Sequence, residues 1–460
     1  MSASHEYIFA GAAADARGGT RRSVLVELTD GRITDVRQQP STGPAERNRR
    51  NASTANDSTV SGAVTRIERP GHLLLPALVN AHAHLDLSHL GPRSYSGDFR
   101  EWIELIRSER RTEDDAIAEA VRQGLELARA GGTGAVGDIA GMASFAPGRA
   151  MREAGMPGVS FLELFGIGRS EASVPETLRR LRAQIDEEDE AGRTRFGLQP
   201  HAPYSCSLAT FARAAATGLP LATHLAETPA EVEFTAAGTG PFREMLESFG
   251  LWEESIRVSG HPPVRHLMEV LRAQPALLAH VNYAERAELE LLASTGCRVV
   301  YCPRATAYFG HHGEGRTEHR YREMLDLGLP VALGTDSLVC LDTPDRIGVL
   351  DEMRLLYRRD RTDPHRLLTM ATTHGANALG LKPSAATLQP GAGATLGIIA
   401  LPFDVNDARD PLAQVLLRDE APEWIVGPTD RAEFFATAPV RAAPGSGDEP
   451  SPDRPRNLSS

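Results

Sequence analysis

Short apolar runs alternate with helix-like stretches through the middle of this chain, and this alternation constrains the fold more than any other feature. The stretches between the runs carry the 3.6-residue periodicity of amphipathic helices, and glycine often closes a helix just before the next run. Strands that alternate with helices pair in parallel. Eight such units predict an α/β fold, a (β/α)8 TIM-type barrel over residues 71–379. The runs are LLLPALVNAHAHL, GTGAVGDIA, GVSFLELFG, FGLQPHAP, LPLATHLAE, ALLAHVNY, CRVVYCP and PVALGTDS.

The two ends of the chain have a different, β-like pattern. Residues 6–38 alternate apolar and polar side chains around Asp30-Gly31, which is typical of a hairpin. After Thr372 the chain is again predicted to form short β-like segments. We therefore expect residues 1–70 and 380–440 to combine into one small β side domain built from both termini.

Two further segments have little to bury. Residues 39–62 are rich in Pro, Ser, Asn and Arg, and residues 441–460 have the same character. Such compositions cannot bury enough apolar surface to offset the entropy lost on ordering. We expect a flexible insertion in the first segment and a disordered tail in the second.

The overall composition bounds the partners and the location. The formal net charge of −12 argues against a nucleic-acid backbone as partner. No apolar run approaches the roughly 20 residues that cross a bilayer, and the first residues do not resemble a signal peptide. Four cysteines without CxxC spacing indicate buried thiols in a reducing compartment. We expect a cytoplasmic enzyme of small molecules, without membrane attachment; a homodimer is left open.

Polar, chemically active side chains gather where the apolar runs end. The carboxyl ends of barrel strands surround one shallow bowl, which is where active sites form. One histidine at a strand end is more often structural than a ligand, but five strands that end in His or Asp outweigh that alternative. The residues concerned are His82, His84, Glu163, His201, His224, His280 and Asp336.

Four of these side chains form a candidate metal site. His82 and His84 are two residues apart on a strand, so both imidazoles point the same way and can reach one ion. His224 adds a third nitrogen and Asp336 an anionic oxygen. The alternative for Asp336 is that it caps the next helix. Such a donor set favours one Zn²⁺, with Fe²⁺ as the other candidate.

Three more residues are candidates for catalysis and substrate binding. Glu227 follows the strand end at His224, where a carboxylate can take a proton from water and deliver it to a leaving nitrogen. Its alternative is a plain acidic residue in the first turn of a helix. His280 is placed to polarise the water or the developing tetrahedral centre. His201 lies across the bowl, where it can hydrogen-bond the substrate.

The motifs resemble those of the amidohydrolase superfamily. They are HAH at 82–84, HAPYSCS at 201–207, HLAET at 224–228, AH at 279–280 and GTDS at 334–337. The resemblance is to the mononuclear branch, which contains S-adenosylhomocysteine, methylthioadenosine, aminodeoxyfutalosine and guanine deaminases and the triazine hydrolases. It implies that the metal ligands are His82, His84, His224 and Asp336. It further implies Glu227 as proton shuttle, His280 as a catalytic orienting residue and His201 as a substrate contact.

The lysine content excludes a lysine-bridged binuclear centre, and the loop after the seventh strand departs from the family pattern. Binuclear members bridge two metals with a carboxylated lysine, but the only lysine here is Lys382, outside the predicted barrel. Glu163 could bridge a second ion instead, although substrate contact or structural support is favoured. After the seventh strand, Arg304 and Tyr308 stand where the nucleoside deaminases usually carry an Asn-Pro-x-Ser-Asn element. Arg304 could bind a substrate carboxylate or phosphate, or form a structural ion pair.

The segment 99–111 adds a predicted lid helix over the bowl. Its Trp102 and Arg107 are candidates for substrate contact from their position alone.

These features predict a metal-dependent amidohydrolase of non-peptide carbon–nitrogen bonds. The favoured reaction is hydrolytic deamination of an amino-purine or a purine nucleoside derivative. A chlorohydrolase or amide hydrolase would use the same water-activating residues, so the motifs leave both open. A catalytically silent metal-binding scaffold is a further alternative, but it would not need Glu227 and His280 beside the ion.

Overall fold

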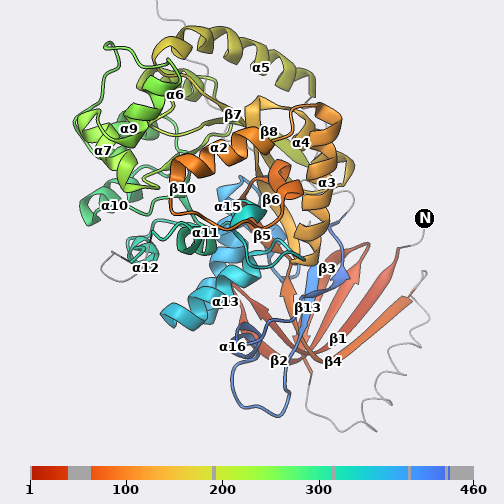
Figure 1. Ribbon diagram of the computed structural model, residues 1–460. Coiled ribbons are helices and arrows are strands. Elements are labelled where there is room, and N and C mark those ends of the chain that lie inside the picture. Colours follow the sequence, from red (N-terminus) through yellow and green to blue (C-terminus); the bar gives the residue numbers. More distant parts are fainter. Residues whose placement is uncertain are drawn as a thin grey trace, which may run out of the picture.

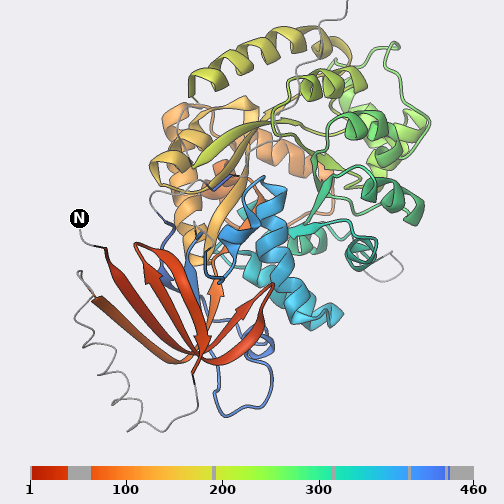
Figure 2. The same cartoon turned by 180° about the vertical axis from the view of Figure 1, so that it is seen from behind.

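The computed structural model describes residues 3–39, 64–188, 193–311, 318–391, 395–429 and 434–435. It has an α/β architecture: helices surround two parallel sheets, and a larger sheet lies at one side of them (Figures 1 and 2). Of the two segments predicted to be unstructured, residues 40–62 and 441–460 lie outside the described residues.

All eight predicted runs form strands, and every pairing among them is parallel. The first four make one sheet in chain order and the last four make a second sheet in chain order. Most of their side chains are buried, which explains why the runs are continuously apolar. The strands are β5 (Leu78–Ala83), β6 (Thr133–Ala140), β7 (Gly158–Leu164), β8 (Thr194–Pro200), β9 (Ala222–Leu225), β10 (Leu277–His280), β11 (Arg298–Tyr301) and β12 (Val331–Leu333).

Two isolated parallel bridges connect these sheets at both of their edges. One joins Leu198 of β8 to Leu221, just before β9, and the other joins Ala83 of β5 to Asp336, beyond β12. At the second junction the carbonyl of His82 accepts the backbone N–H groups of Thr335 and Asp336, at 3.0 and 3.1 Å. The first and last strands therefore meet beside the residues of the candidate metal site.

The helices between the strands bury one face each, as their periodicity predicts. In α3, for example, Ile117, Val121, Leu125 and Ala128 are buried at helical spacing. The longer helices are α2 (Phe99–Glu109), α3 (Asp114–Ala130), α4 (Ala146–Glu153), α5 (Val174–Glu188), α6 (Leu208–Ala216), α7 (Pro229–Ala237), α8 (Pro241–Ser248), α9 (Pro263–Ala273), α10 (Arg286–Ala293) and α13 (Val349–Asp360). The shorter ones are α11 (Pro303–Tyr308), α12 (Tyr321–Asp326), α14 (Pro364–Thr369), α15 (Gly375–Ala378) and α16 (Pro411–Leu416).

Short 3₁₀ or π-helical turns make up the remaining helical elements. They are η1 (Leu85–Leu90), η2 (Gly141–Ala143), η3 (Gly168–Ser173), η4 (Leu338–Cys340), η5 (Met370–His374) and η6 (Pro383–Ala386). The prediction of β-like structure directly after Thr372 is wrong, because η5 and α15 continue the helix as far as Ala378. Within the described residues, no helix has the length and apolar character that crossing a membrane requires.

The larger sheet joins strands from both ends of the chain. Its order is β14-β13-β4-β1-β2-β3. The hairpin predicted at Asp30-Gly31 connects β2 and β3, with both residues at positive φ. Strand β4 continues to Pro76 through residues that the sequence assigns to the barrel, because Leu73–Leu75 pair with β13. The bounds are β1 (His5–Asp15), β2 (Gly19–Thr29), β3 (Arg32–Gln38), β4 (Val64–Pro76), β13 (Ile398–Pro402) and β14 (Glu423–Val426).

Candidate metal centre and active site

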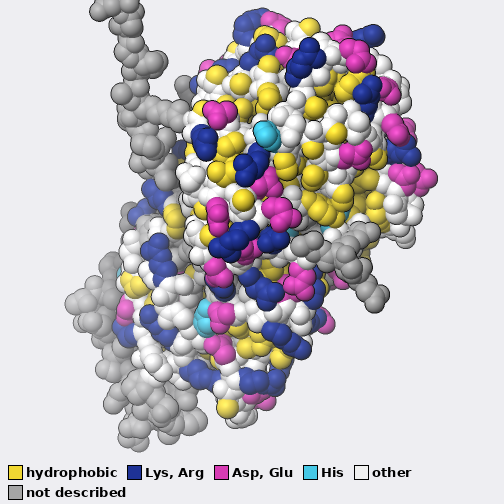
Figure 3. Space-filling model, turned by 90° about the vertical axis from the view of Figure 1, so that its left-hand side faces the viewer, with side chains coloured by type: hydrophobic (Ala, Val, Ile, Leu, Met, Phe, Trp, Pro, Cys, Tyr) yellow, Lys and Arg dark blue, Asp and Glu magenta, His cyan; other side chains and the backbone are white. Residues whose placement is uncertain are grey.

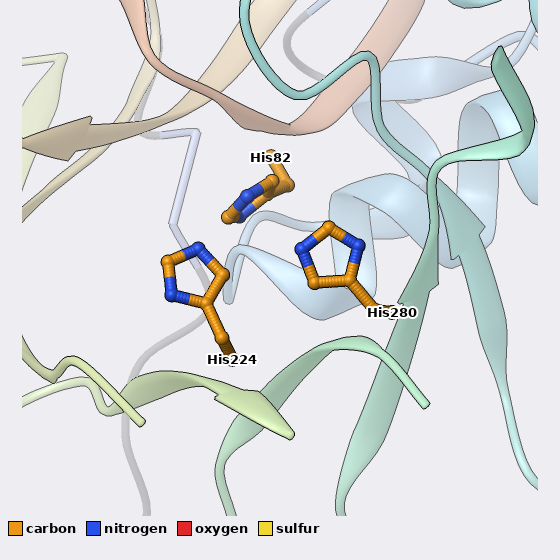
Figure 4. A group of neighbouring side chains, drawn as sticks. All are labelled: His82, His224 and His280. Atoms are coloured by element: carbon orange, nitrogen blue, oxygen red, sulfur yellow. The ribbon is translucent and has the colours of Figure 1, made fainter. Parts of the chain in front are cut away.

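Three histidine rings from different strand ends meet in the space above the parallel sheets. His82 is the penultimate residue of β5, His224 lies in β9 and His280 ends β10. The ring centroid of His82 lies 5.1 Å from that of His224 and 5.5 Å from that of His280. Figure 4 shows the three rings pointing toward a common space. His84 belongs to the same group, with its ring centroid 5.2 Å from that of His82.

Asp336 brings a carboxylate to this cluster from the end of β12. Its Oδ1 lies 3.5 Å from Nε2 of His84. Two ligands of a tetrahedral zinc ion lie about 3.3–3.6 Å apart if their bonds are about 2.0–2.2 Å long. The ligand atoms of His82, His84 and Asp336 all lie within 4.8 Å of one another. Gly334 permits this approach, because a Cβ there would come within 2.9 Å of the Cβ of His82.

The imidazoles are in the form that a metal requires. Burial lowers the pKa of His82, His84 and His224 well below that of an ordinary imidazole, and neighbouring imidazoles add to the effect. These rings are therefore neutral. Nε2 of His82 and Nδ1 of His84 are buried and have no hydrogen-bond partner among the described residues. Unsatisfied buried nitrogens are unfavourable, so the donor set fits a bound divalent cation.

Glu227 and His280 lie beside this cluster as predicted. Glu227 follows β9, and its Oε1 is 3.7 Å from Nε2 of His280. Burial raises the pKa of Glu227 to about 7, so its carboxyl group can both accept and release a proton near neutrality. The ligand atoms of Glu227, His280 and Asp336 again lie within 4.8 Å of one another. The geometry therefore places a proton acceptor next to the candidate metal site.

Backbone conformations at these strand ends are unusual. Ala226, His280 and Asp336 have φ angles of 51°, 72° and 60°, in the left-handed region that non-glycine residues rarely adopt. Such strained positions persist only where the surrounding structure fixes them, and they cluster at functional sites.

His201 lies at the edge of the same site, against Glu163. Its Nε2 is 3.9 Å from a carboxylate oxygen of Glu163, and its Nδ1 is 2.7 Å from the hydroxyl of Ser205. Arg110, just beyond α2, also lies at this site and was not among the predicted residues. Its guanidinium contacts Glu163 at 3.5 Å and Asp86 at 3.0 Å. Arg110 belongs to the predicted lid segment, but nothing in the sequence indicates which of its arginines turns inward.

Arg304 does not match the prediction of a substrate contact. Its Nε donates to Glu352 at 2.6 Å, and its terminal nitrogens donate to Asp342, Thr343 and the carbonyl of Gly348. The side chain is only 8% exposed. Four of the five guanidinium N–H groups are thus bonded within the protein. The structure therefore supports the alternative of a structural ion pair.

The segment predicted to form a lid helix is helical as α2 (Figure 1). Trp102 packs against Phe99 and Phe309, with ring centroids 5.6 and 5.1 Å away. Tyr308 packs against Tyr95, at 5.4 Å. Arg107, by contrast, is exposed and lies over the ring of Phe249.

The sequence profile of the amidohydrolase family matches residues 73–437. The chain belongs to the amidohydrolase family. Among its relatives, an aminodeoxyfutalosine deaminase from Deinococcus radiodurans is 32% identical over 331 residues, which cover 68% of this chain and 75% of the relative. A 5-methylthioadenosine/S-adenosylhomocysteine deaminase from Pyrococcus furiosus is 29% identical over 338 residues, which cover 69% and 72%.

This family membership and the deaminase relatives make the protein a hydrolase of carbon–nitrogen bonds other than peptide bonds. Among solved structures, the zinc complex of an atrazine chlorohydrolase from Arthrobacter aurescens TC1 has the same fold. Its TM-score is 0.71 at 19% identity, and the match covers 95% of this amidohydrolase and 97% of that chain.

Proposed function

We propose that this amidohydrolase deaminates the purine ring of an adenosine derivative, with water replacing the amino group. The relatives from Deinococcus radiodurans and Pyrococcus furiosus, 75% and 72% of whose length the chain matches, are named as deaminases of such nucleosides. The observation that supports the reaction best is the buried Glu227 carboxyl group, 3.7 Å from His280 and beside the histidine–aspartate cluster. A silent metal-binding scaffold would have no use for that group.

The proposed ligands of a single divalent ion are His82, His84, His224 and Asp336. We favour Zn²⁺, because a chlorohydrolase of the same fold is complexed with zinc and the donors are imidazoles with one carboxylate; Fe²⁺ is the alternative. An ion bound there would lower the pKa of water to about 7 and so supply hydroxide at neutral pH. The carbonyl of His201 lies 3.2 Å from Nδ1 of His224, where it can accept that N–H and leave Nε2 for the metal.

The protein's own groups would carry the protons of the reaction. Water adds its oxygen to the amine-bearing carbon, and Glu227 transfers a proton from the water to the adjacent ring nitrogen. The second proton of the water passes through Glu227 to the amino group, which leaves as ammonia. His280 and Asp336 would orient the water, and His201 would hydrogen-bond the ring.

We also propose that the two parallel sheets form one closed (β/α)8 barrel, within residues 71–379. The bridges Leu198–Leu221 and Ala83–Asp336 at the two junctions support closure. The six-stranded sheet would be the core of the side domain, made from residues 1–70 and 380–440, with β4 retained as far as Pro76. Because all four cysteines are buried free thiols, we place the enzyme in the cytoplasm.

An ammonia-release assay tests this function. Zinc- and iron-loaded protein is incubated with adenosine, methylthioadenosine, S-adenosylhomocysteine, aminodeoxyfutalosine, guanine and a chlorotriazine, and ammonia and chloride are both measured. We expect ammonia from one or more of the adenosine derivatives. If only chloride is released, the protein is a chlorohydrolase and the proposal is wrong. If metal-loaded protein releases neither product, the silent metal-binding scaffold is favoured.

A further inference from the structure

Glu231 is a buried carboxylate that directly contacts the loop carrying Glu227. It is the third residue of α7 and is 0% exposed. Its Oε1 accepts the backbone N–H of Ala226 at 2.8 Å, and its Oε2 accepts that of Glu227 at 2.9 Å. Thr228, the N-cap of α7, fixes Glu231 in turn by accepting its N–H at 3.1 Å. Both carboxylate oxygens of Glu231 thus bond to backbone N–H groups of the turn that carries the Glu227 side chain.

Burial of this carboxylate is unfavourable by itself. No ion pair to Glu231 occurs among the described residues, and burial raises its pKa to about 8. Its two backbone hydrogen bonds compensate only part of the cost of removing a charge from water. A serine or threonine alone can cap a helix start without the cost of burying a charge, and Thr228 already caps α7. The carboxylate therefore has a use other than stabilising the helix.

The use that the contacts indicate is the fixation of a strained turn. Ala226 has a φ of 51°, which an alanine adopts only when its neighbours impose it. The neighbouring β10 segment holds the same turn from its other side. The carbonyl of Ala226 accepts the N–H of Tyr283 at 2.9 Å, and the carbonyl of Glu227 accepts the Nδ2–H of Asn282 at 3.1 Å.

We propose that Glu231 is a positioning residue, which holds the Ala226–Glu227 turn so that the Glu227 side chain stays within reach of His280 and the reacting atoms. This inference rests on the proposed function of Glu227 as proton shuttle. Displacement of a catalytic group by about 1 Å can cost roughly 100-fold in rate. The effect of Glu231 on turnover is therefore exerted through Glu227, because both Glu231 oxygens bond to the turn.

The next β/α unit provides a matched control. Glu288 is the third residue of α10 and is 3% exposed, so it is as buried as Glu231. Its Oε2 accepts the N–H of Glu285, the N-cap of its own helix, at 3.0 Å. It thus caps a helix without holding any residue of the site.

The test compares Glu231→Gln with Glu288→Gln. The glutamine amide would turn an N–H group toward a backbone N–H, so one of the two bonds to the turn is lost. For Glu231→Gln we expect kcat to fall roughly 10- to 100-fold, KM to change less than about threefold, and bound metal to stay at the wild-type level. Glu288→Gln should keep wild-type kcat. Glu231→Asp, whose shorter side chain reaches the turn poorly, should repeat the loss and serves if Glu231→Gln does not fold.

A double-mutant cycle separates positioning from a merely structural role. If Glu231 acts through Glu227, then Glu231→Gln should lower kcat less than about twofold when Glu227 is already glutamine. An additive loss in that background, or wild-type kcat in Glu231→Gln, would overturn the inference. If wild-type protein releases no ammonia, the proposed function fails separately. The crystal structure of Glu231→Gln then decides, since an unmoved Ala226–Glu227 turn would also overturn the inference.

Discussion

Two neighbouring β/α units of this molecule share one design and use it differently. In the β9–α7 unit and in the β10–α10 unit, a residue with left-handed backbone lies at the strand end or directly after it: His280 ends β10, and Ala226 follows β9. In both units the next helix has a buried glutamate at its third position. In the first unit that glutamate, Glu231, bonds back to the strand-end turn. In the second, Oε2 of Glu288 accepts the N–H of Glu285, the N-cap of its own helix, and no bond from Glu288 to a strand-end turn occurs among the described residues.

The difference shows how a repeated structural element becomes part of an active site. A glutamate at the third position of a helix stabilises the helix start when it accepts the N–H of the N-cap residue, as Glu288 does. It contributes to chemistry only where its acceptors reach the turn that carries a reactive side chain. Asn282, from the second unit, also bonds to Glu227 of the first, so the two units hold one catalytic group between them.

The largest contrast is expected between the histidines of the two units. His224→Asn should abolish metal binding and with it all turnover, because it removes a proposed ligand. His280→Asn should keep the metal and lower kcat by about 100- to 1,000-fold, as loss of one oriented donor does. Metal content and kcat of both variants check this. Retention of stoichiometric metal by His224→Asn would exclude it from the ligand set.

The second-largest loss of kcat is expected when Glu227, the proton shuttle of the β9–α7 unit, is replaced. Glu227→Gln keeps the shape of the side chain but cannot carry a proton. We expect a loss of about 100- to 10,000-fold in kcat with metal content unchanged. Ammonia-release assays at fixed times measure kcat of this variant. Glu233→Gln, an exposed position on helix α7, is the control. Activity close to wild type would remove Glu227 from the mechanism.

A smaller effect should follow from loosening the contact between the units. Asn282→Ala removes the donor to the carbonyl of Glu227 and leaves the hydroxyl of Thr306 without its acceptor. About a tenfold decrease in kcat is expected, less than for Glu231→Gln, because one bond to the turn is lost and the carboxylate remains. If kcat fell more than in Glu231→Gln, the second unit would be the main support of the turn.

The smallest effect concerns a buried imidazole away from the strand ends. Burial, with help from the nearby His261, lowers the pKa of His266 in α9 to about 4 from an ordinary 6.5. The unfolded chain then binds the proton more readily between these values, so folding stability decreases as the pH falls from 6.5 to 4. Between pH 7 and pH 5 this amounts to about 2 kcal/mol. Melting temperatures should fall less with acid in His266→Gln; equal falls would contradict the assignment.

Most of the site follows from the sequence because it depends on topology. The carboxyl ends of parallel strands converge, so the overlapping groups His82–His224–His280 and His82–His84–Asp336 form once the strands are recognised. The eight strands themselves are recognisable from continuous apolar runs, which only strands buried on both faces require.

The remaining features depend on side-chain partners, which a single sequence does not specify. From the sequence, Arg304 could contact the substrate or an acidic residue. The structure shows that it donates to Glu352. Arg110 was not identified for the same reason. Glu231 had one usable signal, the Thr228-x-x-Glu231 spacing of a capping box directly after the shuttle, but that spacing predicts a helix start and not a bond to Glu227.

The central claim is that three imidazoles and one carboxylate, from the ends of β5, β9 and β12, hold a single catalytic ion. Anomalous diffraction from crystals of the zinc-loaded protein, recorded on both sides of the zinc edge, tests it most directly. The account predicts one strong peak, about 2.0–2.2 Å from nitrogens of His82, His84 and His224 and from an oxygen of Asp336. A peak elsewhere, or none in protein that was supplied with zinc, would contradict it.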